Sequence, residues 1–207
     1  MSDSGSAGAR AIPSPCQPPP QPFLICALPR SRTAWIANFL THGAVRCAHE
    51  LCSVARTPAE LPYLLRQLAG PSGRQTHFVG NADTAQAMIL PRLLEVLPGA
   101  ALVVIRRPPA EVVASLRQLG LPHAETAVRE LERHVEAAAR TPGALVLEYE
   151  ELSSESSARA LQAHVAPGEP FDRCRWALLQ GLNVQVTRQR MLELLRQTER
   201  RVEFFGN

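Results

Sequence analysis

The chain contains no lysine: all 22 basic side chains among its 207 residues are arginines. A phosphate-binding loop of the Gly-x-x-x-x-Gly-Lys-Ser/Thr type is therefore absent, because its lysine must reach the phosphates. Schiff-base chemistry on lysine, including a pyridoxal-phosphate anchor, is excluded for the same reason. Any anion that the protein binds must be held by arginine, histidine, hydroxyl groups or backbone N–H groups.

Other shortages narrow the class of protein. The five cysteines are odd in number and irregularly spaced, which argues against a disulfide framework. No apolar run approaches the roughly 18 residues of a membrane span, and residues 1–22 lack the apolar stretch of a secretory signal. Aromatic residues make up 5% and the net charge is only +3, so no nucleic-acid groove is indicated. We therefore expect a cytoplasmic protein that binds neither nucleic acid nor a membrane.

What is present is an alternation of apolar strands and amphipathic helices. Residues 1–22 are rich in Ser, Gly, Ala and Pro and predict a disordered tail, followed by a single domain over residues 23–207. The alternation indicates a three-layer α/β/α domain with a mostly parallel, P-loop-like sheet of about five strands. The predicted strands are 23–28, 44–49, 76–80, 101–105 and 145–149. The predicted helices are 33–42, 57–68, 84–97, 109–119, 124–140, 154–165 and 172–201, with interruptions at Pro91 and near Gly181.

The first predicted strand runs into a polar turn and then into a helix. This segment reads Pro29-Arg30-Ser31-Arg32-Thr33-Ala34-Trp35. A helix start carries unpaired N–H groups and a partial positive charge, so it favours anions. The hydroxyls of Ser31 and Thr33 add donors, and the guanidinium of Arg30 can bind two phosphate oxygens at once. Taken alone, the segment is equally consistent with an ordinary capped turn.

The strand predicted at 101–105 delivers a second arginine to its end. The sequence there is Arg107-Pro108-Pro109-Ala110-Glu111, and Ser115 follows eight residues after Arg107. Ligands of open α/β sheets bind outside the carboxyl ends of the strands. Arg30 and Arg107 would then face one crevice and hold two separate phosphates, although a surface pair of Arg107 with Glu111 is the alternative.

Together the two segments resemble the sulfotransferases that use 3′-phosphoadenosine 5′-phosphosulfate (PAPS). The 5′-phosphosulfate loop of that family reads Pro-Lys/Arg-Ser-Gly-Thr-Thr-Trp, and its 3′-phosphate motif reads Arg-x-Pro-x-Asp with a Ser eight residues after the Arg. The 77 residues from Arg30 to Arg107 suit the family's separation of the two motifs. A weaker similarity is Leu147-Glu148-Tyr149-Glu150-Glu151-Leu152, beside the family's Tyr-Glu-Asp-Leu. The chain departs from the family at Arg32 (Gly), Ala34 (Thr) and Glu111 (Asp).

The resemblance implies transfer of a sulfuryl group from PAPS to a hydroxyl or amine of a small-molecule, glycan or peptide acceptor. It implies that Arg30 stabilises charge on the leaving phosphate and that no metal is required. It also implies which residues bind the nucleotide. The 5′ side and the adenine would be bound by Arg30, Ser31, Arg32, Thr33, Ala34 and Trp35. The 3′-phosphate would be bound by Arg107 and Ser115.

A general base would accept the proton of the acceptor. We favour Asp83, because it follows the strand predicted at 76–80 and should lie near the crevice. His49, Glu50 and His77 are lesser candidates. Two other functions stay open: a P-loop kinase of a small molecule, with Arg32-Thr33 in place of Lys-Ser/Thr, and a non-catalytic nucleotide or anion binder.

Two further clusters carry weaker signals. Cys47, His49 and Cys52 have metal-ligand spacing but no evident fourth ligand, so we expect no metal site. An Arg-rich, amphipathic C-terminal stretch indicates a solvated helix face, with a homodimer helix or a surface for an acidic substrate as the alternatives.

Overall fold

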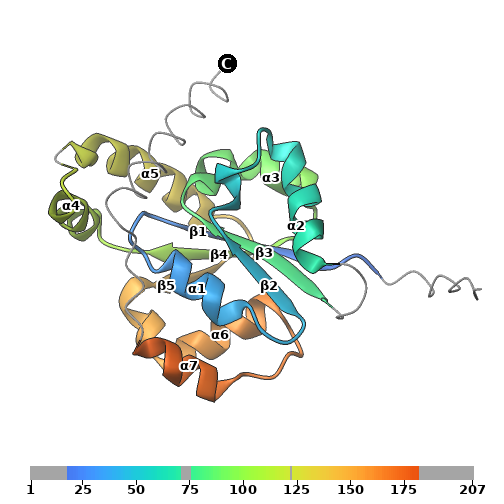
Figure 1. Cartoon of the computed structure of the whole chain (residues 1–207). Helices are drawn as coiled ribbons and strands as arrows, with labels where there is room; N and C mark the ends of the chain where they lie inside the picture. The colour runs from blue at the N-terminus through green and yellow to red at the C-terminus, as the bar shows by residue number, and fades with distance from the viewer. Residues whose placement is uncertain (1–17, 71–75, 122, 182–207) are drawn as a thin grey trace, which may run out of the picture.

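The computed structural model describes residues 18–70, 76–121 and 123–181 (Figure 1). Its sheet has five strands: β1 (Gln21–Ala27), β2 (Val45–His49), β3 (Phe78–Asp83), β4 (Ala101–Arg106) and β5 (Leu145–Glu148). Neighbouring strands all run parallel, in the order β2-β3-β1-β4-β5. The predicted α/β class and five-stranded parallel sheet are therefore confirmed.

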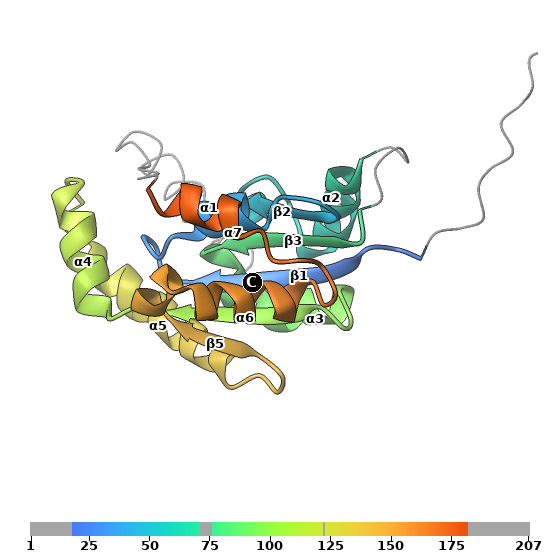
Figure 2. The ribbon, with the colours of Figure 1, turned by 90° about the horizontal axis from the view of Figure 1, so that it is seen from below.

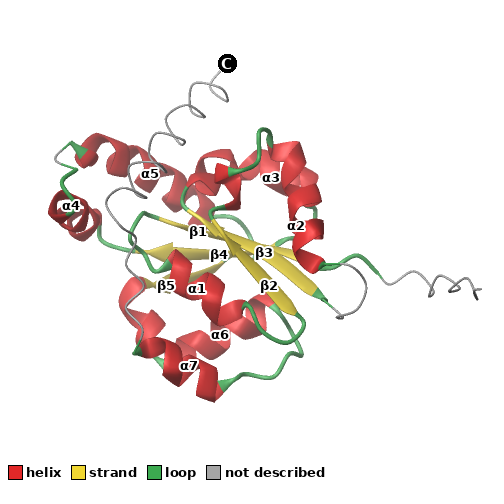
Figure 3. Cartoon of the chain, viewed as in Figure 1, coloured by secondary structure: helices red, strands yellow, loops and turns green. Residues whose placement is uncertain are grey.

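Helices cover both faces of the sheet, which gives the predicted three layers (Figures 2 and 3). One face packs against α1 (Thr33–Leu40), α6 (Glu155–Val165) and α7 (Arg173–Gln180). The other packs against α2 (Leu61–Ala69), α3 (Leu90–Val96) and α5 (Ala124–Ala139), and α4 (Pro109–Gln118) lies against α5. Four short 3₁₀ turns complete the described chain: η1 (Leu51–Ser53), η2 (Pro58–Glu60), η3 (Ala85–Ile89) and η4 (Tyr149–Ser153).

The central strand β1 explains why its sequence is a continuous apolar run. Phe23 and Ile25 point into the core beside α1, whereas Leu24 and Cys26 point into the core beside α3, and all four are 0% exposed. A parallel strand that is buried on both faces has no solvent side and therefore shows no polar alternation.

Several element boundaries differ from those predicted. β1 begins at Gln21, inside the predicted tail, because its N–H donates to the carbonyl of His77 and extends the pairing with β3. β3 continues to Asp83. The helix predicted at 84–97 divides into η3 and α3, and Pro91 lies at the start of α3, where its missing N–H costs no hydrogen bond.

Parts of two predictions lie outside the described residues. These are most of the disordered tail, at residues 1–17, and the Arg-rich C-terminal stretch with its homodimer alternative, at residues 182–207. Across the described ranges, no helix combines the length and apolar character that crossing a lipid bilayer requires.

The strand order reverses direction at β1. From β1 the chain fills β2 and β3 on one side, and then β4 and β5 on the other. Ligands of open α/β folds bind outside the carboxyl ends of the strands at such a reversal. The loops after β1 and β4 carry Arg30 and Arg107, so the topology brings the two predicted motifs to adjacent strand ends.

Candidate anion-binding site

The loop from β1 to α1 has an unusual backbone. Arg30 and Arg32 have φ values of 66° and 61°, in the left-handed region that favours glycine. The PAPS-dependent sulfotransferases have their loop glycine at the position of Arg32. This chain adopts a glycine-like bend there and retains a long cationic side chain.

The start of α1 offers backbone N–H donors that no described side chain satisfies. The residue before the helix, Arg32, makes no side-chain capping hydrogen bond, so the first N–H groups of α1 lack the usual cap. Next to them, Ser31 is 0% exposed, and its hydroxyl has no hydrogen-bond partner among the described residues. A buried hydroxyl without a partner is rare in folded proteins. It fits a loop that is completed by a bound acceptor such as phosphate.

Direct contacts join the two predicted motifs. The Nε of Arg30 donates to the Oγ of Ser115 over 3.2 Å, across 85 residues of sequence. Arg107 donates from Nη1 to the carbonyl oxygen of Arg30. The structure therefore brings together Arg30, Ser115 and Arg107, which the sequence had placed at two separate strand ends.

A tyrosine that sequence reasoning did not assign lies against two of these arginines. The Cζ atoms of Arg107 and Arg32 lie 4.0 Å and 5.5 Å from the ring centroid of Tyr149. The ring reaches them because β5 pairs with β4 in register, Arg106 beside Glu148, so the next residue of each strand is adjacent. The weak Tyr-Glu-Glu-Leu similarity was the only signal in the sequence that pointed to this residue.

The site carries an excess of positive charge. Arg107 pairs with Glu111 through its Nε at 3.3 Å, but Arg30 and Arg32 form no ion pair with any described carboxylate. Three guanidinium groups at adjacent strand ends create a positive potential that attracts anions. The alternative of a simple surface pair of Arg107 with Glu111 accounts for one of the three charges.

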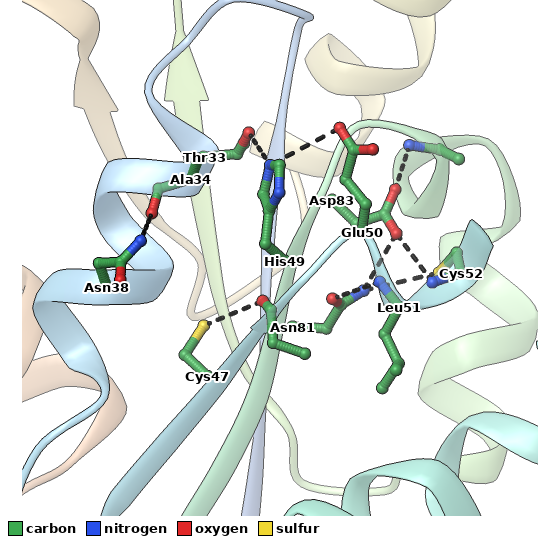
Figure 4. A network of polar contacts seen from close by, with 12 residues as sticks. Thr33, Ala34, Asn38, Cys47, His49, Glu50, Leu51, Cys52, Asn81 and Asp83 are labelled. Atoms are coloured by element: carbon green, nitrogen blue, oxygen red, sulfur yellow. Dashed lines mark hydrogen bonds and ion pairs between the residues drawn. The ribbon is translucent and has the colours of Figure 1, made fainter. Parts of the chain in front are cut away.

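Asp83 lies in a buried polar network (Figure 4). Its Oδ2 accepts from the N–H of Cys52 at 2.9 Å and from Nδ2 of Asn81 at 3.3 Å, and its Oδ1 accepts from the N–H of Ala85 at 2.7 Å. The side chain is 3% exposed. These contacts give Asp83 the role of holding η1 and η3 at the end of β3. Its assignment as a general base stays a prediction that this geometry does not favour.

The lesser candidates for the general base lie at opposite ends of the strands. His49, at the end of β2, shares a hydrogen bond of 3.1 Å between its Nε2 and the Oγ1 of Thr33, and the same nitrogen lies 3.6 Å from Glu50 (Figure 4). His77 precedes β3 at the opposite edge of the sheet, where it lies 3.8 Å from Glu169. His49 therefore contacts the start of α1, with Glu50 beside it, and His77 lies at the other end of the strands.

Other candidate residues have structural explanations. Trp35 is 5% exposed, stacks on Phe39 with centroids 5.2 Å apart, and donates to the carbonyl of Leu179 over 3.0 Å. Core packing thus accounts for Trp35 without an adenine. Burial raises the pKa of the Cys26 and Cys47 thiols well above the ordinary value, which makes both poor nucleophiles.

Two negative findings complete the description of the site. The described residues contain no group of three or more His, Cys, Asp or Glu side chains arranged to hold a metal ion. A scan against protein-family models found no match, and a search of curated proteins found none either. Fold and site define an α/β protein with an arginine cluster at the carboxyl edge of its sheet, and the likeness to sulfotransferases rests on the motif residues themselves.

Replacing Asp83 with asparagine should lower the free energy of unfolding by about 2 kcal/mol. The amide keeps one acceptor oxygen of two, and a hydrogen bond to a charged group is worth about 1.5–3 kcal/mol. Chemical denaturation measures the change. As a control, Asp172→Asn alters an exposed carboxylate that caps α7 at Arg175, where asparagine caps equally well. Unchanged stability combined with lost turnover would identify Asp83 as a base instead.

Proposed function

We propose that the protein is a sulfotransferase that uses PAPS. An oxygen or nitrogen of the acceptor attacks the sulfur, and the bond between sulfur and the bridging oxygen of the 5′-phosphate breaks. The phosphate retains the electron pair and the acceptor loses its proton, so the products are a sulfated acceptor and 3′,5′-ADP. The acceptor is a hydroxyl or amine of a small molecule, glycan or peptide.

The observation that carries the proposal is the hydrogen bond between Arg30 and Ser115. It links the motif that resembles the 5′-phosphosulfate loop with the motif that resembles the 3′-phosphate site. The pairing of β1 with β4 brings the two segments to adjacent strand ends, and the hydrogen bond joins the guanidinium of one motif directly to the hydroxyl of the other. The meeting point lies at the reversal of strand order, where α/β folds bind ligands.

Each side of the nucleotide has its own donors. At the 5′ side, the N–H groups at the start of α1, the Ser31 hydroxyl and Arg30 stabilise the charge that grows on the leaving phosphate. At the 3′ side, Arg107 and Ser115 bind the phosphate that distinguishes this nucleotide from ATP. Ala34 supplies no hydroxyl, and Arg32 adds a cation where the family has glycine.

His49 is better placed than Asp83 to accept the proton of the acceptor. Its side chain is 28% exposed beside the Thr33 hydroxyl at the start of α1, whereas Asp83 is 3% exposed and holds two backbone N–H groups. Histidine is also the commonest side chain in this role, because its pKa lies near physiological pH.

The kinase alternative has one feature in its favour and two against. Asp83 ends β3, the strand beside β1, from which a kinase could hold Mg²⁺. Its carboxylate is, however, occupied and 3% exposed, and the loop has no lysine. A non-catalytic binder of the same nucleotide is favoured by one observation, the Arg32 side chain in place of the loop glycine.

Thermal unfolding in the presence of nucleotides tests the proposal. At about 100 times its dissociation constant, a ligand stabilises the folded state by about 2.7 kcal/mol, or roughly 5–10 °C for a chain of this size. We expect 3′,5′-ADP to produce this shift and ADP or ATP–Mg²⁺ to produce little. Transfer of label from PAPS to acceptors then separates an enzyme from a binder. Absence of a shift with 3′,5′-ADP would refute the proposal, and a shift with ATP–Mg²⁺ alone would favour the kinase.

A further inference from the structure

We infer that Tyr149 is a positioning residue that couples the two ends of the anion site. It holds Arg32 of the β1–α1 loop and Arg107 of the β4 end against one ring, so that the site selects ligands with two separated anionic groups. The inference rests on the proposed function, because it concerns how that site recognises a nucleotide with phosphates at both its 5′ and 3′ positions.

The ring of Tyr149 is shared by residues from two different strand ends. Arg107 lies 4.0 Å and Arg32 lies 5.5 Å from its centroid, within the range of about 6 Å at which a cation is attracted to an aromatic ring. Tyr149 itself follows a third strand, β5. One side chain therefore links the β1, β4 and β5 ends of the sheet.

Tyr149 is fixed in place by the turn that it begins. Glu148 and Glu151 form a reciprocal capping box around η4, and Leu152 in the same turn is 0% exposed. A capping box ties the backbone on both sides of the tyrosine. The turn thus fixes the backbone from which the ring reaches the two arginines.

An aromatic ring can hold two guanidinium groups together without neutralising their charge, which a carboxylate could not do. Arg32 and Arg107 repel each other, and a carboxylate placed between them would hold them together but cancel their charge. The ring attracts both cations through its quadrupole and adds no charge. It also uses none of their N–H donors: Arg107 donates from Nε to Glu111 and from Nη1 to the Arg30 carbonyl, and its Nη2 has no partner among the described residues.

Because Arg32 and Arg107 share one ring, binding of an anion at one guanidinium should favour binding at the other. An anion that fixes one guanidinium against Tyr149 also fixes the ring for the other, so the second anionic group meets a site that is already ordered. A ligand with a single phosphate gains only part of this effect. The preference for 3′,5′-ADP over AMP should therefore depend on Tyr149, although the tyrosine need not contact either phosphate.

Calorimetric titration of the full chain with 3′,5′-ADP and with AMP tests this role. Tyr149→Phe should bind both within about twofold of the original, because the ring face is kept. Tyr149→Leu should lose about tenfold in affinity for 3′,5′-ADP and less for AMP, as expected for loss of cation–ring contacts. Arg32→Gly should cost about tenfold on its own, and its combination with Tyr149→Leu should cost less than the product of the two single losses, since both changes remove the contact between Arg32 and Tyr149.

A series of fluorinated phenylalanines at position 149 separates ring electrostatics from shape and covers the case in which Tyr149→Leu fails to fold. Fluorination weakens the quadrupole while the ring stays in place, so affinity for 3′,5′-ADP should fall stepwise along the series. Equal affinities along the fluorinated series, or additive effects of Arg32→Gly and Tyr149→Leu, would overturn the inference. In either case, binding of 3′,5′-ADP by the unaltered chain would still uphold the proposed function. If the unaltered chain does not bind 3′,5′-ADP, the proposed function itself fails.

Discussion

Replacing Arg107 with alanine should weaken binding of 3′,5′-ADP by about 100-fold and weaken binding of AMP much less. Hydrogen bonds to charged groups contribute about 1.5–3 kcal/mol, and the upper value corresponds to roughly 100-fold in affinity. Arg107 also donates to the carbonyl of Arg30, so some loss at the 5′ side accompanies the larger loss at the 3′ side. Titration calorimetry with both nucleotides measures the two losses separately.

Two further variants define the cause of this effect. Arg107→Lys keeps the charge but loses the planar fork that binds two oxygens, so its affinity should fall between that of the original and the alanine variant. Arg66→Ala removes the same charge from an exposed position on α2, where the guanidinium contacts the carbonyl of Pro62, and should leave both affinities unchanged. An unaltered preference of Arg107→Ala for 3′,5′-ADP over AMP would remove Arg107 from the 3′-phosphate site.

Replacing Gly80 with alanine should destabilise the fold by about 3 kcal/mol or more. Gly80 lies in β3 directly opposite Phe23 of β1, and a Cβ atom at this position would lie 2.2 Å from two ring carbons of Phe23. Phe23 is 0% exposed and cannot move into solvent, so β1 must shift. Overpacking of this kind costs about 1–3 kcal/mol and occasionally more. Chemical denaturation should show a lower midpoint.

A matched glycine and a compensating change provide the controls. Gly181 follows α7 with a φ of −77°, and the nearest atom to an added Cβ is 3.7 Å away, so Gly181→Ala should be nearly neutral. Adding Phe23→Leu to Gly80→Ala should recover part of the loss, because the smaller side chain makes room for the new methyl group. If the two changes are instead additive, the clash with Phe23 is not the cause.

The residues that sequence alone could place are those at the ends of strongly apolar strands. β1 and β4 are buried on both faces, so their apolar runs located Arg30 and Arg107 within a residue or two. A parallel sheet brings such strand ends to one edge whatever the order of its strands. Ser115 followed from Arg107 through the resemblance, because the family's motif has a serine eight residues after its arginine.

The residues that sequence could not place depend on tertiary pairing. Tyr149 reaches the arginines because β5 lies beside β4, and the order of strands is not encoded in any one strand. Asp83 was located near the crevice but was assigned as a base, since nothing in the sequence shows that the N–H groups of Cys52 and Ala85 turn back onto its carboxylate. From the sequence, the Trp35 side chain could equally face a ligand or the core. Its contacts with Phe39 and Leu179 in the structure place it in the core.

The central position of β1 also affects when this strand can pair with its neighbours during synthesis. Its partners β3 and β4 lie far along the chain, with Phe23 beside Gly80 and Ala101. Ribosomes add about 5–20 residues per second, so the 78 residues from Phe23 to Ala101 take roughly 4–16 s to make. Until β3 has been made, the fully buried strand β1 has no neighbouring strand to pair with, and β4 follows later still. Such non-local pairing is intrinsically slow. The strand that positions Arg30 is made first and enclosed late, which makes the nascent chain, more than the finished domain, vulnerable to aggregation.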